Sequence, residues 1–108
     1  MTGIDPAPLF RALADPTRRA LFEALCREGE ATVVALTRGA GVSQPAVSKH
    51  LRQLREAGLV EDRPDGRQVH YRPRPEALAP LADWTERQAR FWSTHLDRLE
   101  DLLRRMDQ

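Results

Sequence analysis

Apolar residues in this chain recur at helical spacing over most of its length, and the clearest case lies within residues 42–60. The apolar residues of that stretch share one line on a helix and must face a core: Val47, Leu51 and Leu54. Ser43 can accept a hydrogen bond from a free amide of the first turn, and Gly58 ends the pattern. The pattern therefore predicts a helix that begins at residue 43 or 44 and ends near residue 57.

The opposite face of this predicted helix is polar and holds no carboxylate before Glu56. The major groove of DNA accepts a helix with one anchored face and one face of hydrogen-bonding and cationic groups. We therefore expect this face to contact phosphates or base edges; the alternative is an ordinary solvated helix face. The candidate residues are Ser43, Gln44, Ser48, Lys49 and Arg52. His50, at the edge of the buried face, is an equal candidate for a phosphate contact and for a hydrogen-bonded structural role.

Two shorter helical patterns stand near the N-terminus. The first carries Leu9, Phe10 and Leu13, and it is too short to be stable without packing onto another element. The second begins at Asp15-Pro16, where a capping carboxylate precedes a proline in the first turn, and it ends at Gly29. Its apolar face holds Leu21, Phe22 and Leu25.

A third short helix is expected after Thr32, which can cap it, and it carries Val33 and Leu36. The Gly-Ala-Gly run at residues 39–41 then forms a turn into the polar-faced helix. A helix, a glycine-containing turn and a second helix form the helix-turn-helix arrangement, here over about residues 32–57.

A β-hairpin is expected next, because short β-prone runs at residues 59–60 and 69–71 flank the strong turn signal Asp65-Gly66. Pro64 would weaken a central strand, which predicts a two-stranded ribbon over about residues 59–73. The residues near its tip suit phosphate or minor-groove contacts, against the alternative of a solvated hairpin: Arg63, Arg67 and Gln68. A basic hairpin that follows a DNA-reading helix is a wing.

The helical period returns at residue 75 and continues to about residue 106, with Pro80 expected to delay the continuous helix to about Leu81. Its apolar stripe exceeds what the core of so short a chain needs, so we expect it to pack against a second copy. The expected interface residues are Leu9, Phe10, Leu13, Trp84, Phe91, Trp92, Leu96, Leu99 and Leu103. A small-molecule pocket between the two tail helices is the alternative use of the aromatic residues.

Length and charge agree with this picture. With 108 residues the chain is expected to form a single domain, for which pairing is a natural way to gain core. The formal charge of +1 by itself indicates no partner. Residues 44–74, however, hold seven basic against four acidic side chains, whereas residues 75–108 hold five against seven. The basic part is therefore the part expected to meet DNA.

Other classes of protein find little support. The one cysteine, Cys26, excludes an intramolecular disulfide and is expected to be a small core or boundary residue rather than a redox switch. His70 and His95 are too isolated to predict a metal site, and we expect no cofactor. No stretch approaches the roughly 18 apolar residues of a membrane span, so we expect a cytoplasmic protein without a membrane partner. The sequence has no glycine-rich phosphate loop, paired carboxylates or activated nucleophile, which argues against an enzyme.

Three motifs stand in order along the chain: A-L-A-D-P-T-R-R-A-L-F-E-A-L at residues 12–25, S-Q-P-A-V-S-K-H-L-R-Q-L-R-E-A-G-L-V at residues 43–60 and G-R-Q-V-H-Y-R at residues 66–72. Together they resemble the ArsR/SmtB family of bacterial winged-helix transcriptional repressors, over about residues 10–72. The resemblance implies a mainly α winged helix-turn-helix fold with a small β-hairpin and with dimerisation helices at both ends. It also implies that the helix pair reads DNA and that a signal relieves repression.

Metal sensors of that family carry a Cys-x-Cys motif in the helix before the recognition helix, or carboxylates and histidines on the last helix. In this chain the segment that corresponds to the Cys-x-Cys motif is T-V-V-A-L-T at residues 32–37. On the last segment Asp83 and His95 occur, but Thr85 and Leu96 stand where paired ligands would be expected. The sequence thus departs from both metal patterns, and F-W-x-x-x-L-D-x-L-x-x-L at residues 91–102 resembles a metal-free branch.

We therefore expect a homodimeric, sequence-specific repressor that binds a pseudo-palindromic double-stranded DNA operator. The rival hypothesis is a dimeric protein-interaction module in which the winged helix binds protein, and the basic wing argues against it. The inducing signal stays unknown at this stage.

Overall fold

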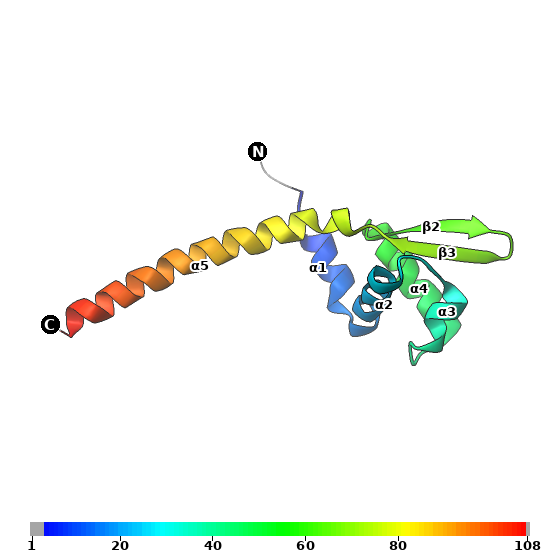
Figure 1. Cartoon of the computed structure of the whole chain (residues 1–108), viewed down its shortest axis with the longest axis horizontal. Coiled ribbons are helices and arrows are strands. Elements are labelled where there is room, and N and C mark those ends of the chain that lie inside the picture. Colours follow the sequence, from blue (N-terminus) through cyan, green and yellow to red (C-terminus); the bar gives the residue numbers. More distant parts are fainter. Residues whose placement is uncertain (1–3, 108) are drawn as a thin grey trace.

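The computed structural model describes residues 4–107. In chain order its elements are α1 (Ala7–Ala14), α2 (Pro16–Glu28), β1 (Ala31–Thr32), α3 (Val33–Arg38), α4 (Gln44–Glu56), β2 (Val60–Asp65), β3 (Gln68–Pro73), a 3₁₀ turn (Pro75–Leu78) and α5 (Ala79–Met106). Helices α1 to α4 form a body from which the β2–β3 hairpin and α5 extend in opposite directions, over 73 × 34 × 20 Å (Figure 1). The fold is mainly α, with a winged helix-turn-helix at its centre.

Side-chain caps start three of the helices where the sequence predicts them. Asp15 Oδ2 accepts a hydrogen bond from Arg18 N at 2.9 Å, and Thr32 Oγ1 accepts one from Ala35 N at 3.1 Å. Ser43 Oγ accepts a longer one from Ala46 N at 3.3 Å. Each cap satisfies an amide that the first turn leaves without a helical partner, which places α2, α3 and α4 at the expected residues.

The core lies where α2, α3, α4 and the sheet meet. The apolar line of α4 is wholly buried there, since Val47, Leu51 and Leu54 are each 0% exposed. Around that line pack buried residues from the other elements: Leu9, Ala12, Leu21, Phe22, Leu25, Leu36, Leu59, Val60 and Tyr71. One face of α4 is thus anchored, and the opposite face is left for other contacts.

The expected hairpin is confirmed, since β2 and β3 pair antiparallel, but the sheet has a third strand that the sequence did not predict, in the order β1-β3-β2. The two-residue strand β1 pairs with β3, Ala31 opposite Tyr71 and Thr32 opposite His70. So short a strand has no alternation that a sequence pattern can reveal. Gly66 and Arg67 form the turn of the hairpin, and Gly66 has a φ of +63°, a conformation open to glycine.

The last helix begins two residues earlier than expected. Pro80 lies in the first turn of α5, which starts at Ala79 and not near Leu81. A proline in that turn lacks only an amide that has no helical partner there, so it permits the start of the helix instead of delaying it.

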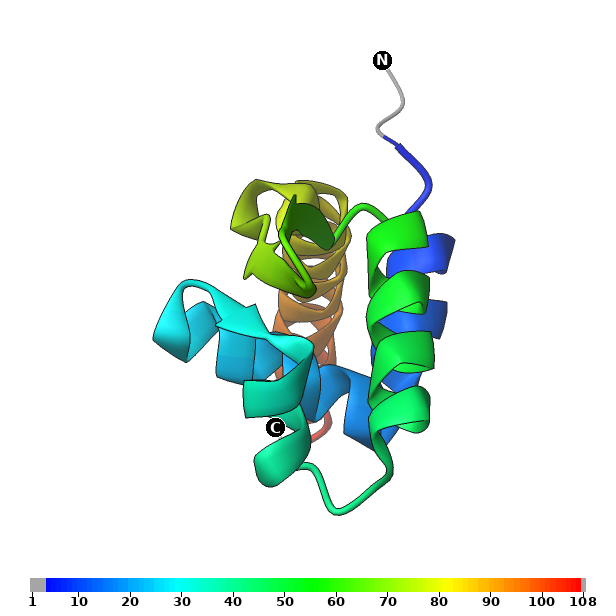
Figure 2. The same cartoon turned by 90° about the vertical axis from the view of Figure 1, so that its right-hand side faces the viewer.

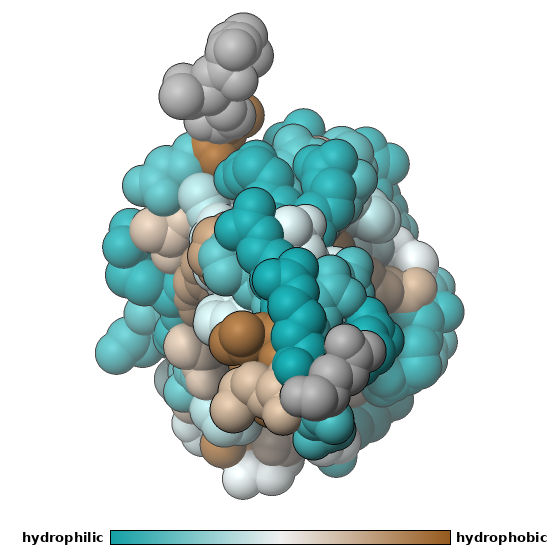
Figure 3. Space-filling view, turned by 90° about the vertical axis from the view of Figure 1, so that its left-hand side faces the viewer, coloured by the Kyte–Doolittle hydropathy of each residue, from teal (hydrophilic) through white to brown (hydrophobic). Residues whose placement is uncertain are grey.

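The apolar stripe of α5 lies on the surface of the single chain. Its large side chains are about half exposed: Phe91, Trp92, Leu96, Leu99, Leu102 and Leu103. Figure 3, which views the molecule from the C-terminal end of α5, shows brown apolar surface beside teal polar surface at this end. An amphipathic helix that projects from its own body leaves its apolar face without cover.

Three expected interface residues lie close to the body. Leu9 is only 5% exposed, so the structure places it in the core of the chain and corrects its assignment to an interface. Leu13 packs partly buried against the same core. Phe10 stays 41% exposed and meets Trp84 of α5 edge to face, with ring centroids 5.0 Å apart. The Phe10–Trp84 contact ties α1 to the start of α5.

Candidate nucleic-acid interface

The outer face of α4 is open and cationic. Lys49 and Arg52 are exposed, and Ser48 is half-buried at the edge of the face. Gln44 is exposed at the first position of the helix, directly after the capping residue Ser43. The opposite line of α4 is buried, so this face is held rigidly while its polar groups point away from the core. That is the geometry of a helix that can enter a major groove.

His50 turns toward the beginning of α2. Its Nε2 lies 4.0 Å from Asp15 Oδ2, and its side chain is 20% exposed. Its Nδ1 is buried and has no hydrogen-bond partner within residues 4–107. The pKa of Asp15 lies below its usual value, first because Arg18 N–H donates to it and then through the positive field of His50. This position between two helices favours the structural role for His50 over a phosphate contact.

The wing is joined to α4 through an ion pair. Arg55 of α4 contacts Asp62 of β2 at 2.9 Å, and Arg72 of β3 pairs with Glu61 across the hairpin. Arg67 and Gln68 are exposed at the tip. The Arg55–Asp62 pair thus links the last turn of α4 to β2 of the wing.

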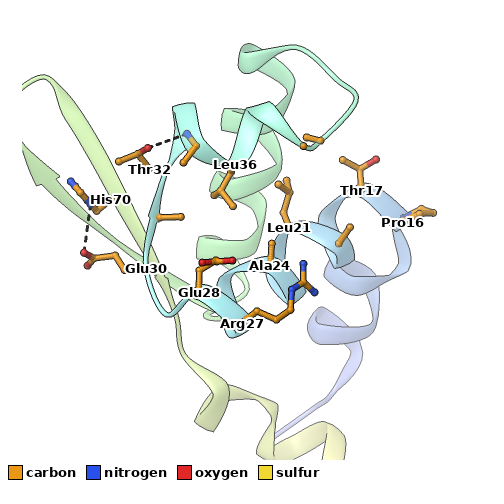
Figure 4. A pocket seen from close by; sticks show the side chains of 15 residues that line it. Pro16, Thr17, Leu21, Ala24, Arg27, Glu28, Glu30, Thr32, Leu36 and His70 are labelled. Carbon is orange, nitrogen blue, oxygen red and sulfur yellow. Dashed lines mark hydrogen bonds and ion pairs between the residues drawn. The ribbon is translucent and has the colours of Figure 1, made fainter.

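Arg63 is bound within the chain. Its Nη2 lies 3.0 Å from Glu30 Oε2, just before β1, and its Nη1 lies 3.9 Å from Asp65. His70 faces the same two carboxylates, at 3.5 Å from Glu30, as Figure 4 shows, and at 3.8 Å from Asp65. The Arg63 hydrogen bond holds the pKa of Glu30 below its usual value. A phosphate that binds Arg63 would have to compete with Glu30. Arg67 lies exposed at the tip instead.

Sequence reasoning missed Arg18 and Gln53. Arg18 Nη1 donates to Gln53 Oε1 of α4 at 2.7 Å, while its Nε donates to Ala12 O of α1, also at 2.7 Å. The two side chains are 35 positions apart, so only the D-P-T-R run next to the cap could have drawn attention to Arg18.

Cys26 was expected at the core or its boundary, and the structure corrects this, because the side chain is exposed. The elements packed on α2 cover Leu21 and Leu25 but stop short of Cys26. Its pKa is raised, first by partial desolvation and then by the negative field of Glu23, which favours the unreactive thiol. Within residues 4–107 no three His, Cys, Asp or Glu side chains are grouped to hold a metal ion. None of the described helices is both long and apolar enough to cross a membrane.

A cavity of about 800 Å³ lies between α2 and α3 (Figure 4). Leu21 and Leu36 border it, and most of its remaining apolar lining is alanine: Ala20, Ala24, Ala31, Ala35 and Ala40. Helices α2 and α3 and strands β1 and β3 supply these walls, so the cavity is distinct from the pocket considered between tail helices. Small side chains on separate elements leave no periodic signal, which is why the sequence did not indicate this cavity.

Comparison with known proteins places this geometry in a family. A model of a helix-turn-helix domain matches residues 13–63. The arsenic resistance transcriptional regulator ArsR1 of Pseudomonas putida is 47% identical over 73 residues, which are 68% of this chain but only 57% of that regulator. The transcriptional regulator Rv2034 of Mycobacterium tuberculosis is 44% identical over 91 residues, covering 84% of this chain and 81% of the relative. The chain belongs to the ArsR/SmtB family.

Solved structures of ArsR-family proteins share the fold. A regulator known as RHA00566 superimposes with a TM-score of 0.75 at 32% identity, over 85% of this chain and 97% of the other. The homodimeric winged helix-turn-helix DNA-binding domain Mb0332 of Mycobacterium bovis gives a TM-score of 0.62 at 28% identity, over 82% of this chain and 90% of the other. Family membership makes the chain a DNA-binding transcriptional regulator of the repressor type.

Proposed function

We propose that this ArsR/SmtB-family chain is a homodimeric repressor that binds a pseudo-palindromic operator. The observation that carries the proposal is α4, which has one wholly buried face and one open face bearing Ser48, Lys49 and Arg52. Two such helices, one from each copy, would enter successive major grooves, and Arg67 and Gln68 of each wing would reach the flanking backbone. Lys49 and Arg52 suit phosphates or guanine edges, and Gln44 suits adenine.

Selection from random DNA tests this proposal. The chain should enrich fragments with a repeated, inverted half-site, and its affinity should fall steeply with salt because cations on α4 and the wing displace phosphate counterions. Replacing Ser48 and Arg52 together by Ala should abolish specific binding while the mass on sizing stays that of the wild type. Loss of the dimer instead would show that this face of α4 has been misassigned, and a flat salt dependence would count against phosphate contacts.

The wing separates this proposal from the protein-interaction hypothesis. Replacing Arg67 and Gln68 by Ala removes exposed polar groups at the tip and leaves the Arg63–Glu30 contact in place. A DNA-binding wing predicts weaker operator binding by this variant. Unchanged DNA affinity would show that the wing tip makes no DNA contact, and absence of specific DNA binding by the wild type would favour the interaction module. We propose no catalytic step for this chain, and we expect it to act in the cytoplasm, where bacterial DNA lies.

The signal that releases DNA should differ from that of thiol-based sensors. Soft metal ions and metalloids select clusters of thiolates, whereas this chain offers the single exposed Cys26, whose pKa is raised by partial burial. Although several relatives are named for arsenic resistance, we infer that arsenite leaves the operator complex intact. The same binding assay, repeated with metals, oxidant and pools of metabolites, identifies the signal.

A further inference from the structure

One guanidinium joins three helices in the body of this protein. Arg18, in the first turn of α2, donates from Nε to Ala12 O at 2.7 Å and from Nη2 to Arg11 O at 3.1 Å. Both acceptors are carbonyls in the last turn of α1. The third nitrogen, Nη1, donates to Gln53 Oε1 on α4 at 2.7 Å. Arg18 therefore fixes the end of α1 against α4 from its own place on α2.

The two helices that Arg18 connects, α1 and α4, have different roles in the proposed repressor. Through the edge-to-face contact of Phe10 with Trp84, α1 is joined to α5, the helix with the exposed apolar stripe. Gln53 directly follows Arg52 and lies one helical turn after Lys49, both on the open face of α4. A constraint on Gln53 thus restricts the rotation of the face expected to meet DNA.

The contact lies at the seam between α1 and α4. In Figure 2 α1 (dark blue) lies behind α4 (green), and a shallow cleft between the two helices is lined by Pro8 and Ala12 of α1 and by Gln53 and Glu56 of α4. The Arg18 bridge spans this cleft and connects the two helices beyond the core that they share.

We propose that Arg18 is a positioning residue that sets the orientation of α4 relative to α1, and so aligns the DNA-reading face with the dimer. This inference rests on the proposed function. Each nitrogen of the guanidinium already donates one hydrogen bond inside the chain, so Arg18 acts on DNA through α4 and not as a phosphate contact. A planar guanidinium can serve three acceptors on two helices at once, and a lysine ammonium of the same charge lacks that geometry.

The experiment compares operator binding of matched variants, with the duplex selected from random DNA as the probe. Gln53→Leu removes the acceptor without changing charge, and Arg18→Lys keeps the charge but loses the planar fork. Arg18→Met removes both. Arg19→Met is the control, because Arg19 also donates to a carbonyl of α1, Leu13 O at 2.9 Å, but to no group of α4. Fluorescence anisotropy at several salt concentrations gives the affinity, while sedimentation and thermal unfolding confirm dimer and fold.

Gln53→Leu, Arg18→Lys and Arg18→Met should each weaken operator binding about tenfold, the effect of one lost charge-assisted hydrogen bond. The slope of affinity against salt should stay that of the wild type, since no phosphate contact is lost. The double variant Arg18→Met, Gln53→Leu should bind no more weakly than Arg18→Met alone, because both changes remove the same interaction. Arg19→Met should bind within about twofold of the wild type, as expected for a change at an exposed site.

Two results would overturn the inference. Wild-type affinity in a folded, dimeric Gln53→Leu variant would show that the bridge does not position α4. A salt slope lowered by about one in Arg18→Met, with Gln53→Leu unaffected, would make Arg18 a direct phosphate contact. If Arg18→Met does not fold, the neutral Gln53→Leu decides the question alone. If the wild type binds no selected duplex, the proposed function itself is wrong. That result differs from the two results that would overturn the role of Arg18.

Discussion

Neighbouring residues on α4 have opposite surroundings. Leu51 is 0% exposed in the core, whereas Lys49 and Arg52, close to it in sequence, are exposed on the open face. The free energy of unfolding should therefore depend on Leu51, and DNA affinity on its polar neighbours. This separation makes the assignment of the two faces testable with single substitutions.

Leu51→Ala should lower the free energy of unfolding by about 2–5 kcal/mol, because it leaves a cavity where α4 meets the body. Lys49→Ala should change it by no more than about 0.5 kcal/mol, as is usual at exposed positions, yet weaken operator binding. Urea denaturation and anisotropy measure the two quantities. A large loss of stability in Lys49→Ala would show that its side chain packs on the protein.

Residues that act within one turn of helix could be predicted, and residues that act across the fold could not. Asp15, Thr32 and Ser43 cap helices within three positions of themselves, so a local pattern suffices. Arg18 and Glu30 have partners 35 and 33 positions away. Their roles follow from how the helices and the wing fold together, which no local pattern encodes.

At the scale of elements, charges anchor the wing near the middle of its two long strands, where Arg63 lies opposite His70. Glu30, just before β1, binds Arg63 of β2 and lies near His70 of β3, so one carboxylate contacts both long strands. The two-residue strand β1 adds backbone pairing to β3 at the same place. The wing is thus held midway along its strands, while Arg67 and Gln68 stay exposed at its tip.

Acid should loosen this anchor. Because Arg63 lowers the pKa of Glu30 from 4.5 in the folded chain, ionised Glu30 stabilises the fold above that value. The stabilisation is lost as the pH falls through the lowered pKa. The urea midpoint of the wild type should therefore drop as the pH falls below the usual range of a glutamate, and Glu30→Gln should show a smaller drop. Glu28→Gln is the control and should keep the wild-type pH dependence. Equal drops in wild type and Glu30→Gln would mean that Glu30 does not anchor the wing.

At the scale of the whole molecule, the chain leaves the apolar stripe of α5 uncovered. Helix α5 projects from the body with Phe91, Trp92, Leu99 and Leu103 about half exposed (Figure 1). Burying such a stripe against the same helix of a second copy would gain a core that one short chain lacks. The interface expected from the sequence is therefore confined to Phe10, Leu13 and the α5 stripe, without Leu9.

Replacing Leu96 and Leu103 by Glu should convert the protein into monomers of 12.3 kDa, whereas the wild type should have twice that mass. Two charges on the stripe cannot be buried without partners, and both side chains are more than half exposed, so the monomer should still fold. Sedimentation equilibrium measures the mass. Arg98→Glu with Arg105→Glu, on the other side of α5, is the matched control. A dimeric Leu96→Glu, Leu103→Glu variant would place the interface elsewhere.

Spacing along the chain was enough to predict the helices, their caps, the hairpin and the polar face of α4, because each depends on contacts within a few residues. Only the packed chain shows that β1 completes the sheet, that Leu9 lies in the core, that Cys26 is exposed and that Arg18 bridges α1 and α4. These features depend on which surfaces meet after the elements pack, so their partners are remote in sequence and their signals are single residues without a period.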